Sequence, residues 1–279
     1  MPAAEAGLGR RGPVGRFLSG LRCFARLQAM NIKSMLSYVA DTWIEMALFT
    51  VQQMTGLVFL WVVFSRVRAV GGWTLSEIVF LYGLLVLSMA FYRLVFQGVR
   101  DTGYMIMHGA LDQLLTKPRS VLLLLSCRRS NITGAMDFVT GLALVIAAGV
   151  RMDYQWSPGR VAQLVVFVFS GNAIMVAVMM AQAATCFWLV RFTVLHELIM
   201  ALRRFCHYPI GIYGSVLRVL VSTAVPLAFC SYYPAGVLLA KDGLSPWWSL
   251  GPPLVAMASL AAAVGLFKLG QRAYESTGS

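Results

Sequence analysis

Long apolar stretches alternate with shorter polar ones along most of this chain. A helix of about 20 apolar residues crosses the hydrocarbon of a bilayer. Six stretches reach this length: 43–65, 78–97, 130–150, 161–190, 213–232 and 247–269. Their apolar runs are continuous and lack the strict alternation of a membrane barrel, which favours helices. The sequence therefore predicts an all-α membrane protein with six transmembrane helices.

Two segments precede the first span. Residues 1–15 are rich in Ala, Gly and Pro, and we expect them to be disordered. Residues 16–38 carry an apolar and a basic set of positions: Phe17, Leu18, Leu21, Phe24, Leu27 and Met30 against Arg16, Arg22, Arg26 and Lys33. This pattern predicts an amphipathic interfacial helix on the inner leaflet. We expect residues 16–279 to form one membrane domain.

The segment between the second and third spans, residues 98–120, is too polar to cross a bilayer, and we call it the elbow. Apolar side chains recur in it near helical spacing: Met105, Met107, Leu111, Leu114 and Leu115. Gly109 precedes the leucine run and Pro118 ends it, because proline disfavours helix at the residue before it. We predict a short helix that presents a leucine edge to another surface. An ordinary surface helix covering its own bundle is the alternative.

The distribution of basic residues predicts the orientation. On this layout five basic residues lie on one side of the membrane: Arg66, Arg68, Arg151, Arg160 and Lys241. Arg93 lies in the second span, and all other lysines and arginines, including Arg203 and Arg218, fall on the opposite side. The side richer in Lys and Arg is normally cytoplasmic. We therefore expect both termini, the elbow and the basic segment 191–212 on the cytoplasmic side.

Composition and charge limit the class of partner. Hydrophobic residues make up 59% of the chain and charged residues 12%, with a mean hydropathy of +0.73, which excludes a soluble domain. A formal charge of +12 suggests nucleic acid in a soluble chain. Here the arginines border apolar runs, as do topology determinants and contacts to anionic lipids. We expect membrane lipids and no nucleic acid as partners. The five cysteines show no metal-binding spacing.

Catalytic motifs are absent from the sequence. It contains no GxxxxGK[ST], so the chain cannot hold a nucleotide through a P-loop, and it contains no GxSxG. His196-Glu197 begins like a zinc-protease motif, but Met200 stands where the second histidine belongs. We expect no enzyme activity, no cofactor and no metal.

Asp137 is the clearest ionisable residue within a predicted span, and burial of such a group is unfavourable unless function or a partner compensates it. Arg93, near the same end of the second span, is its most plausible partner. A structural ion pair and a contact to substrate or protons are both open for these two residues.

Four patterns, in order, resemble the type-2 permease family of ABC transporters. They are Gly71-Gly72-Trp73 with Thr74 and Glu77; Gly109-Ala110-Leu111-Asp112 with Leu114, Leu115 and Pro118; His207-Tyr208-Pro209-Ile210 with Tyr213, Arg218, Pro226 and Tyr233-Pro234-Ala235; and Tyr274-Glu275-Ser276-Thr277-Gly278-Ser279. The spacing is similar from about Phe24 to the end. Within the family, the chain is similar to a bacterial six-span subfamily.

The resemblance implies a permease in the bacterial inner membrane. Two permease subunits, identical or homologous, would assemble with two copies of a separate ABC ATPase subunit. The elbow would be the coupling helix that docks into the ATPase. By this resemblance the coupling residues are Tyr104, Met107, Gly109, Leu111, Asp112, Leu114, Leu115 and Pro118.

The family does not supply the cargo. Export is expected by analogy, and the lack of a dense ring of charge in the spans favours an amphipathic or apolar substrate. Two other classes stay open: a stand-alone secondary transporter or channel, although the two halves show no clear repeat, and a membrane scaffold that transports nothing.

Overall fold

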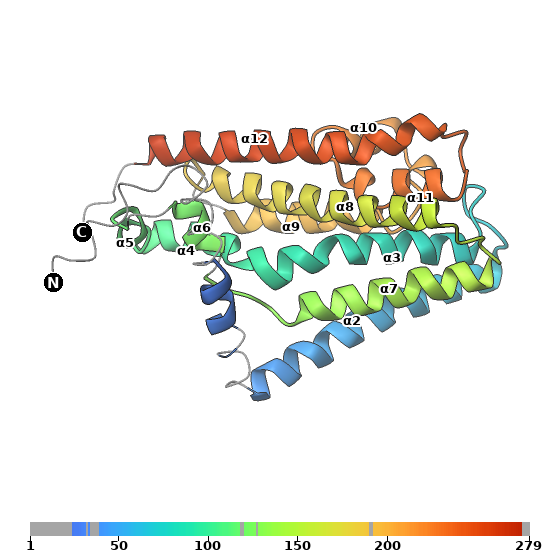
Figure 1. The fold of residues 1–279 in the computed structure, drawn as a ribbon, viewed down its shortest axis with the longest axis horizontal. Helices are drawn as coiled ribbons and strands as arrows, with labels where there is room; N and C mark the ends of the chain where they lie inside the picture. The colour runs from blue at the N-terminus through green and yellow to red at the C-terminus, as the bar shows by residue number, and fades with distance from the viewer. Residues whose placement is uncertain are drawn as a thin grey trace.

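The computed structural model describes residues 24–31, 33, 39–117, 120–126, 128–189 and 192–274. These residues form helices, and the longer ones lie roughly along one long axis (Figure 1). The longer helices are α2 (Val39–Arg66), α3 (Leu75–Phe91), α7 (Thr133–Arg151), α8 (Pro158–Thr185), α9 (Phe192–Phe205) and α12 (Gly251–Ala273). The short helices α4 (Thr102–Met107), α5 (Asp112–Leu115) and α6 (Val121–Ser126) gather at one end, which we call the elbow end. The loop between α2 and α3 lies at the other end, the loop end. The predicted all-α class is confirmed.

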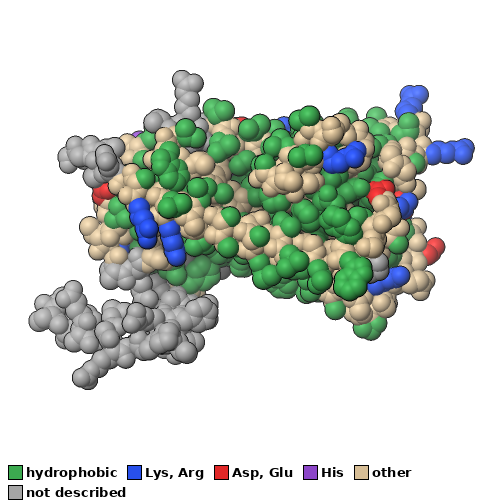
Figure 2. Space-filling view, turned by 90° about the horizontal axis from the view of Figure 1, so that it is seen from above, with side chains coloured by type: hydrophobic (Ala, Val, Ile, Leu, Met, Phe, Trp, Pro, Cys, Tyr) green, Lys and Arg blue, Asp and Glu red, His purple; other side chains and the backbone are tan. Residues whose placement is uncertain are grey.

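Five segments of the described chain are long and apolar enough to cross a membrane: Ala40–Arg66, Leu75–Met107, Thr133–Arg151, Pro158–Thr185 and Trp247–Ala273. They coincide with all the predicted spans except the fifth. Figure 2 shows apolar side chains along the length of one face, with lysines and arginines mainly toward its two ends. Residues 1–15 and most of the predicted interfacial helix 16–38 lie outside the described residues; residues 24–31 are helical.

The central helix of the bundle is α3, and glycines let α7 approach it closely. A Cβ on Gly83 would lie 3.0 Å from the Gly141 carbonyl oxygen, and a Cβ on Gly141 would lie 2.9 Å from that of Gly83. Two turns earlier on α7, Gly134 meets the backbone of Leu94 in the same way. Small residues are typical of helix contacts in membranes, where close packing replaces the hydrophobic driving force.

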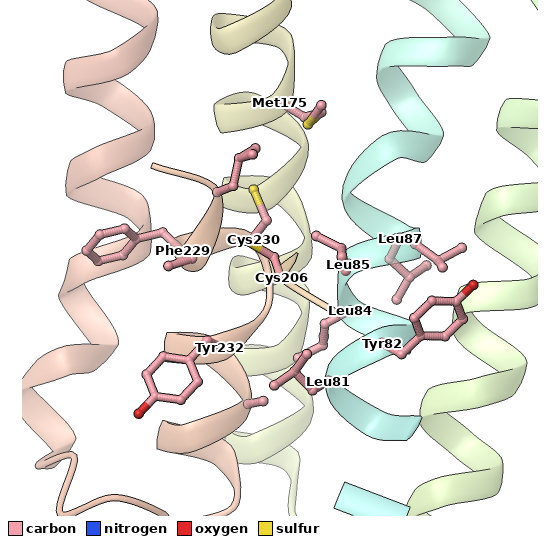
Figure 3. Packing of buried hydrophobic residues seen from close by; sticks show 14 of the residues in the cluster. Leu81, Tyr82, Leu84, Leu85, Leu87, Met175, Cys206, Phe229, Cys230 and Tyr232 are labelled. Atoms are coloured by element: carbon pink, nitrogen blue, oxygen red, sulfur yellow. The ribbon is translucent and has the colours of Figure 1, made fainter. Parts of the chain in front are cut away.

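The opposite side of α3 packs on α8 and on a broken segment after α9. Leu85 of α3 faces Cys206 and Cys230, and Met175 of α8 lies in the same cluster (Figure 3). These side chains are all buried. This is the main apolar core of the bundle.

The fifth predicted span, 213–232, with an interruption expected at Pro226, does not form a continuous spanning helix. The chain there forms α10 (Ser215–Ser222), a 3₁₀ turn η4 (Leu227–Cys230) and the start of α11 (Tyr232–Leu238). Pro226 precedes η4 and has no amide hydrogen for a helical hydrogen bond. The Cys230 thiol donates to the Gly171 carbonyl oxygen, in the middle of α8, at 3.6 Å. The segment therefore enters the bundle halfway and turns back.

Residues 192–212 run the length of the bundle instead. Ile199 and Leu202 of α9, and Cys206 directly after it, are buried in the core. Beyond α9, Ile212 reaches the loop end, where a Cβ on Gly71 would lie 2.5 Å from Ile212 Cγ2. The sequence predicted 191–212 as a basic, amphipathic segment on the cytoplasmic surface; residues 192–212 instead pack along the bundle with part of the segment buried in its core. The charged residues of the segment concealed this buried apolar side.

Polar contacts at the loop end hold the returning segment. The fully buried Trp73 donates its indole N–H to Asp242 Oδ2 at 3.2 Å, and the Tyr232 hydroxyl donates to the same oxygen at 2.6 Å. Lys241 Nζ pairs with Glu77 Oε1 at 2.9 Å. The end of α11 is thereby fixed to the loop between α2 and α3.

Candidate functional site

The elbow continues directly from α3. The α-helix changes to a π-helical turn, η1 (Tyr92–Phe96), then to a 3₁₀ turn, η2 (Gln97–Asp101), and then to α4 (Thr102–Met107). Gly98 lets η2 approach α6 (Val121–Ser126), since a Cβ there would overlap the Leu125 carbonyl oxygen. The Gly98 amide donates to the Arg129 carbonyl oxygen at 3.2 Å. The elbow is thus a packed extension of α3.

Within the elbow, a turn separates α4 from α5 (Asp112–Leu115), a short helix over the leucine run. Gly109 in this turn has φ +63°, in the left-handed region that favours glycine. Pro118, predicted to end the helix, lies outside the described residues.

The inner side of the elbow is buried against the bundle. Leu111 and Met105 are 0% and 1% exposed. They share a cluster with Met180 and Ala184 of α8 and with Phe267 of α12, which we call the elbow cluster. Leu111 therefore anchors the elbow, contrary to the prediction that it faces outward. Periodicity marks an apolar edge but does not say which surface the edge covers.

The outer side leaves three large apolar side chains in contact with solvent. Tyr104 and Met107 are each 56% exposed and Leu115 is 41% exposed; Leu114 is half-buried beside them. His108 stacks on Tyr104 with ring centroids 4.0 Å apart, and its Nδ1 lies 2.8 Å from the Tyr104 carbonyl oxygen. We call Tyr104, Met107 and Leu115 the elbow face.

The C-terminal end of α12 joins the elbow at the half-buried Asp112. Tyr274 lies beside it, and partial burial and then the Asp112 carboxylate raise the pKa of the Tyr274 phenol. The Tyr274 ring packs edge-on against Phe187 at 6.0 Å between centroids, and Phe187 packs against Phe267 at 5.4 Å. Aromatic side chains thus connect the elbow with the ends of α8 and α12. Residues 275–279 lie outside the described chain.

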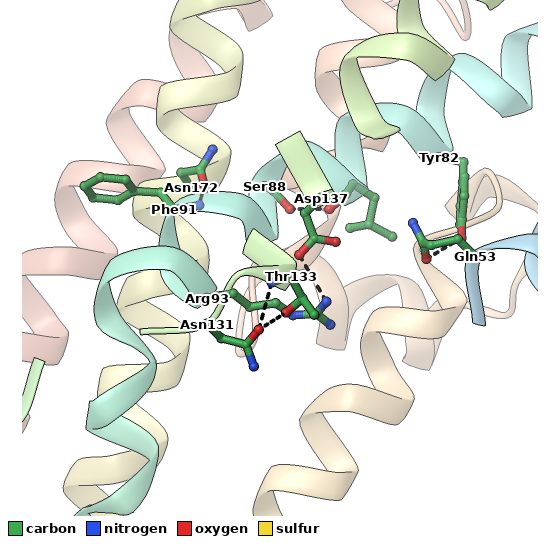
Figure 4. A network of polar contacts seen from close by, with 10 residues as sticks. Gln53, Tyr82, Ser88, Phe91, Arg93, Asn131, Thr133, Asp137 and Asn172 are labelled. Carbon is green, nitrogen blue, oxygen red and sulfur yellow. Dashed lines mark hydrogen bonds and ion pairs between the residues drawn. The ribbon is translucent and has the colours of Figure 1, made fainter. Parts of the chain in front are cut away.

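The predicted partners Arg93 and Asp137 meet inside the bundle (Figure 4). Arg93 Nη1 lies 3.1 Å from Asp137 Oδ2, and the two side chains are 20% and 4% exposed. The Arg93 guanidinium also lies 5.8 Å from the centroid of the Phe49 ring on α2. A buried charge in a membrane protein is unfavourable unless a partner compensates it. Each member of this pair compensates the other.

Sequence reasoning missed Arg203, which it placed on the membrane surface. Arg203 lies in the last turn of α9 and interacts electrostatically with Asp137, Arg93 and Tyr82. The Tyr82 hydroxyl in turn donates to Gln53 Oε1 at 3.1 Å (Figure 4). In the sequence, Arg203 is one basic residue beside another, and no local pattern indicates that it turns inward.

An all-helical bundle with five segments able to cross a membrane defines a multi-pass membrane protein. The model of a family described as ABC-2 family transporter protein matches residues 50–278. The chain belongs to this family, and the resemblance found in its sequence is confirmed. Comparison with curated proteins and with solved structures gave no match. Within the described residues, no three His, Cys, Asp or Glu side chains are grouped as a metal site.

Proposed function

We propose that the chain is the permease subunit of a bacterial ABC transporter and exports its cargo across the inner membrane. The observation that carries the proposal is the elbow face, where exposed apolar side chains lie on a segment anchored to the bundle. The chain that bears it belongs to the ABC-2 transporter family. The sequence has no P-loop, so ATP hydrolysis falls to a separate subunit. Two permease subunits, identical or homologous, assemble with two ATPase subunits.

In this proposal the elbow end is cytoplasmic and the chain crosses the membrane six times. Residues 192–212 make the fifth crossing, and residues 213–240 form a hairpin that enters from the outer side and returns. Irregular backbone at membrane depth is compatible with a bilayer where protein surrounds it. The buried Leu227 and Cys230 at the turn of the hairpin support this arrangement.

Docking on the ATPase explains how ATP hydrolysis in that subunit can move the helices of the bundle. A helix in a groove buries exposed apolar side chains, here Tyr104, Met107 and Leu115. The elbow cluster then passes the movement of the ATPase to α8 and α12, while the continuous backbone passes it to α3. Access to the cargo alternates by rigid-body movement of these helices.

Association with the ATPase tests the proposal. Leu115→Asp combined with Met107→Asp places two charges in the docking surface, and we expect the amount of co-purified ATPase to fall about tenfold or more. Val67→Asp is the matched control, since Val67 is 42% exposed at the loop end and Leu115 is 41% exposed. Both variants should insert into the membrane as the unmodified chain does.

Two results contradict the proposal. Undiminished ATPase association of the double variant would refute docking through the elbow face. Transport by the purified chain in vesicles that contain no nucleotide-hydrolysing subunit would favour a stand-alone transporter instead.

A further inference from the structure

Two guanidinium groups meet a single carboxylate inside the bundle. Arg93 is paired with Asp137 at 3.1 Å, and Arg203 of α9 acts on both of them electrostatically. Arg203 itself forms no ion pair with an acidic side chain among the described residues. One positive charge therefore stays uncompensated at this level of the bundle, which is strongly unfavourable unless an anion joins it.

Arg203 and Gln53 carry buried hydrogen-bond donors without an acceptor, while the acceptor Asp137 Oδ2 is engaged by its ion pair with Arg93. The buried Nε and Nη1 atoms of Arg203 have no hydrogen-bond partner among the described residues. Gln53 accepts from Tyr82 through Oε1, which leaves the buried Gln53 Nε2 without an acceptor. The His207 ring lies 4.8 Å from the Tyr82 ring on the same side. Buried N–H donors of Gln53 on α2 and Arg203 on α9 thus find no acceptor among the described residues.

The surroundings offer both a polar route and an apolar surface. A pocket of about 480 Å³ lies between α2, the start of the elbow and α7. Its charged lining residues are Arg93, Arg100 and Arg129 with Glu45 and Asp101, so the basic side chains outnumber the acidic ones. On α2, Met54 and Val58 are each 56% exposed, close in sequence to Gln53. A charged group can reach Arg93 through the pocket while an apolar chain lies along α2.

We propose that Arg203, together with the Arg93–Asp137 pair and Gln53, binds the anionic group of an amphipathic molecule, a phosphate or a carboxylate. The guanidinium fork of Arg203 offers two parallel N–H donors to such an oxyanion. The apolar part of the molecule lies against the exposed side chains of α2. That this molecule is the cargo rests on the proposed permease function; the binding itself does not.

Charge-selective stabilisation of the purified chain tests the site. In dodecyl maltoside, decyl phosphate should raise the midpoint of thermal unfolding by about 3 °C or more. Decyltrimethylammonium, with the same chain and the opposite charge, should not raise it. Equal stabilisation by inorganic phosphate would assign the site to a free oxyanion and overturn the assignment to an amphiphile. Equal stabilisation by both decyl compounds would overturn the anion site.

A neighbouring arginine provides the matched control. Arg203→Gln should abolish the shift, whereas Arg204→Gln should keep it, because Arg204 is exposed and next in sequence. Arg203→Lys keeps the positive charge but lacks the two parallel N–H donors of the guanidinium group, so decyl phosphate should raise its thermal midpoint by less. This variant keeps the proposal testable if Arg203→Gln does not fold. An unchanged response of Arg203→Gln would refute the site. Association with the ATPase should be normal in all three variants, so this failure is distinguishable from failure of the permease proposal.

Discussion

The effect of losing one buried charge in this bundle depends on whether the charges that remain still have a partner of opposite sign. Asp137 is ion-paired with Arg93 and lies within electrostatic range of Arg203, whereas neither arginine forms another ion pair among the described residues. The carboxylate is therefore the common partner of the site. Its removal leaves two uncompensated positive charges, but removal of Arg93 leaves Arg203 available to Asp137.

This asymmetry predicts an order of stability. Asp137→Asn should lower the free energy of unfolding by about 3 kcal/mol, and Arg93→Gln should lower it by less. Glu45→Gln is the control, because the Glu45–Arg129 pair is 3.8 Å apart with both side chains exposed, and its loss should change stability by about 1 kcal/mol or less. Denaturant unfolding in detergent measures all three. A larger loss for Arg93→Gln than for Asp137→Asn would contradict the role assigned to the carboxylate.

Glycine at the α3–α7 contact gives a second prediction for a single residue. Gly134→Ala would place a Cβ against the backbone of Leu94 and Ala90, and we expect a loss of about 1–3 kcal/mol as α7 is pushed away from α3. Gly265→Ala in α12 has nothing within 4 Å and should be neutral, or stabilising by up to about 1 kcal/mol. If the two alanines have the same effect on the thermal midpoint, close approach does not hold these helices together.

At the scale of elements, the elbow combines an anchored side and an exposed side in a few residues. Leu111 and Leu115 are one helical turn apart and identical in type, yet one is 0% and the other 41% exposed. Helical periodicity predicts that a short helix exists here but not which leucine faces the bundle. The positions of α8 and α12 decide this, through Met180 and Phe267, and they are distant in the sequence.

Local exchange of amide hydrogens should separate the two sides. Leu111→Ala leaves a cavity in the elbow cluster, and we expect faster exchange across residues 102–115, because losing a buried leucine weakens such packing by about 2–5 kcal/mol. Met107→Ala, on the elbow face, should leave exchange unchanged. Exchange in α7 should stay the same in both variants. Faster exchange throughout the bundle of Leu111→Ala would show that Leu111 belongs to the general core and not to a local anchor.

For the whole molecule, hydropathy locates the helices that are apolar throughout but does not show that residues 192–212 pack into the bundle. Five predicted spans coincide with helices able to cross a membrane, with shifted ends. Residues 192–212 contain His196, Glu197, Arg203 and Arg204, so their mean hydropathy is low although Ile199 and Leu202 are buried. Residues 213–232 are apolar but broken at Pro226. Only the packed structure shows that Arg203 lies within electrostatic range of the Asp137 carboxylate.

If residues 192–212 make the fifth crossing in place of 213–232, Arg218 lies on the outer side of the membrane and not on the cytoplasmic side that the sequence predicted. Cysteine labelling can test this. The Arg218 guanidinium donates to the Gly211 and Tyr213 carbonyl oxygens at 3.0 and 3.3 Å, next to Ile212 at the loop end. In a cysteine-free background, Arg218→Cys should react with an impermeant thiol reagent from the same side as Arg68→Cys, and Gln113→Cys in the elbow from the opposite side. All three positions are exposed. Reaction of Arg218→Cys only from the Gln113 side would restore a single spanning helix over 213–232, and the fifth crossing proposed for 192–212 would be lost with it.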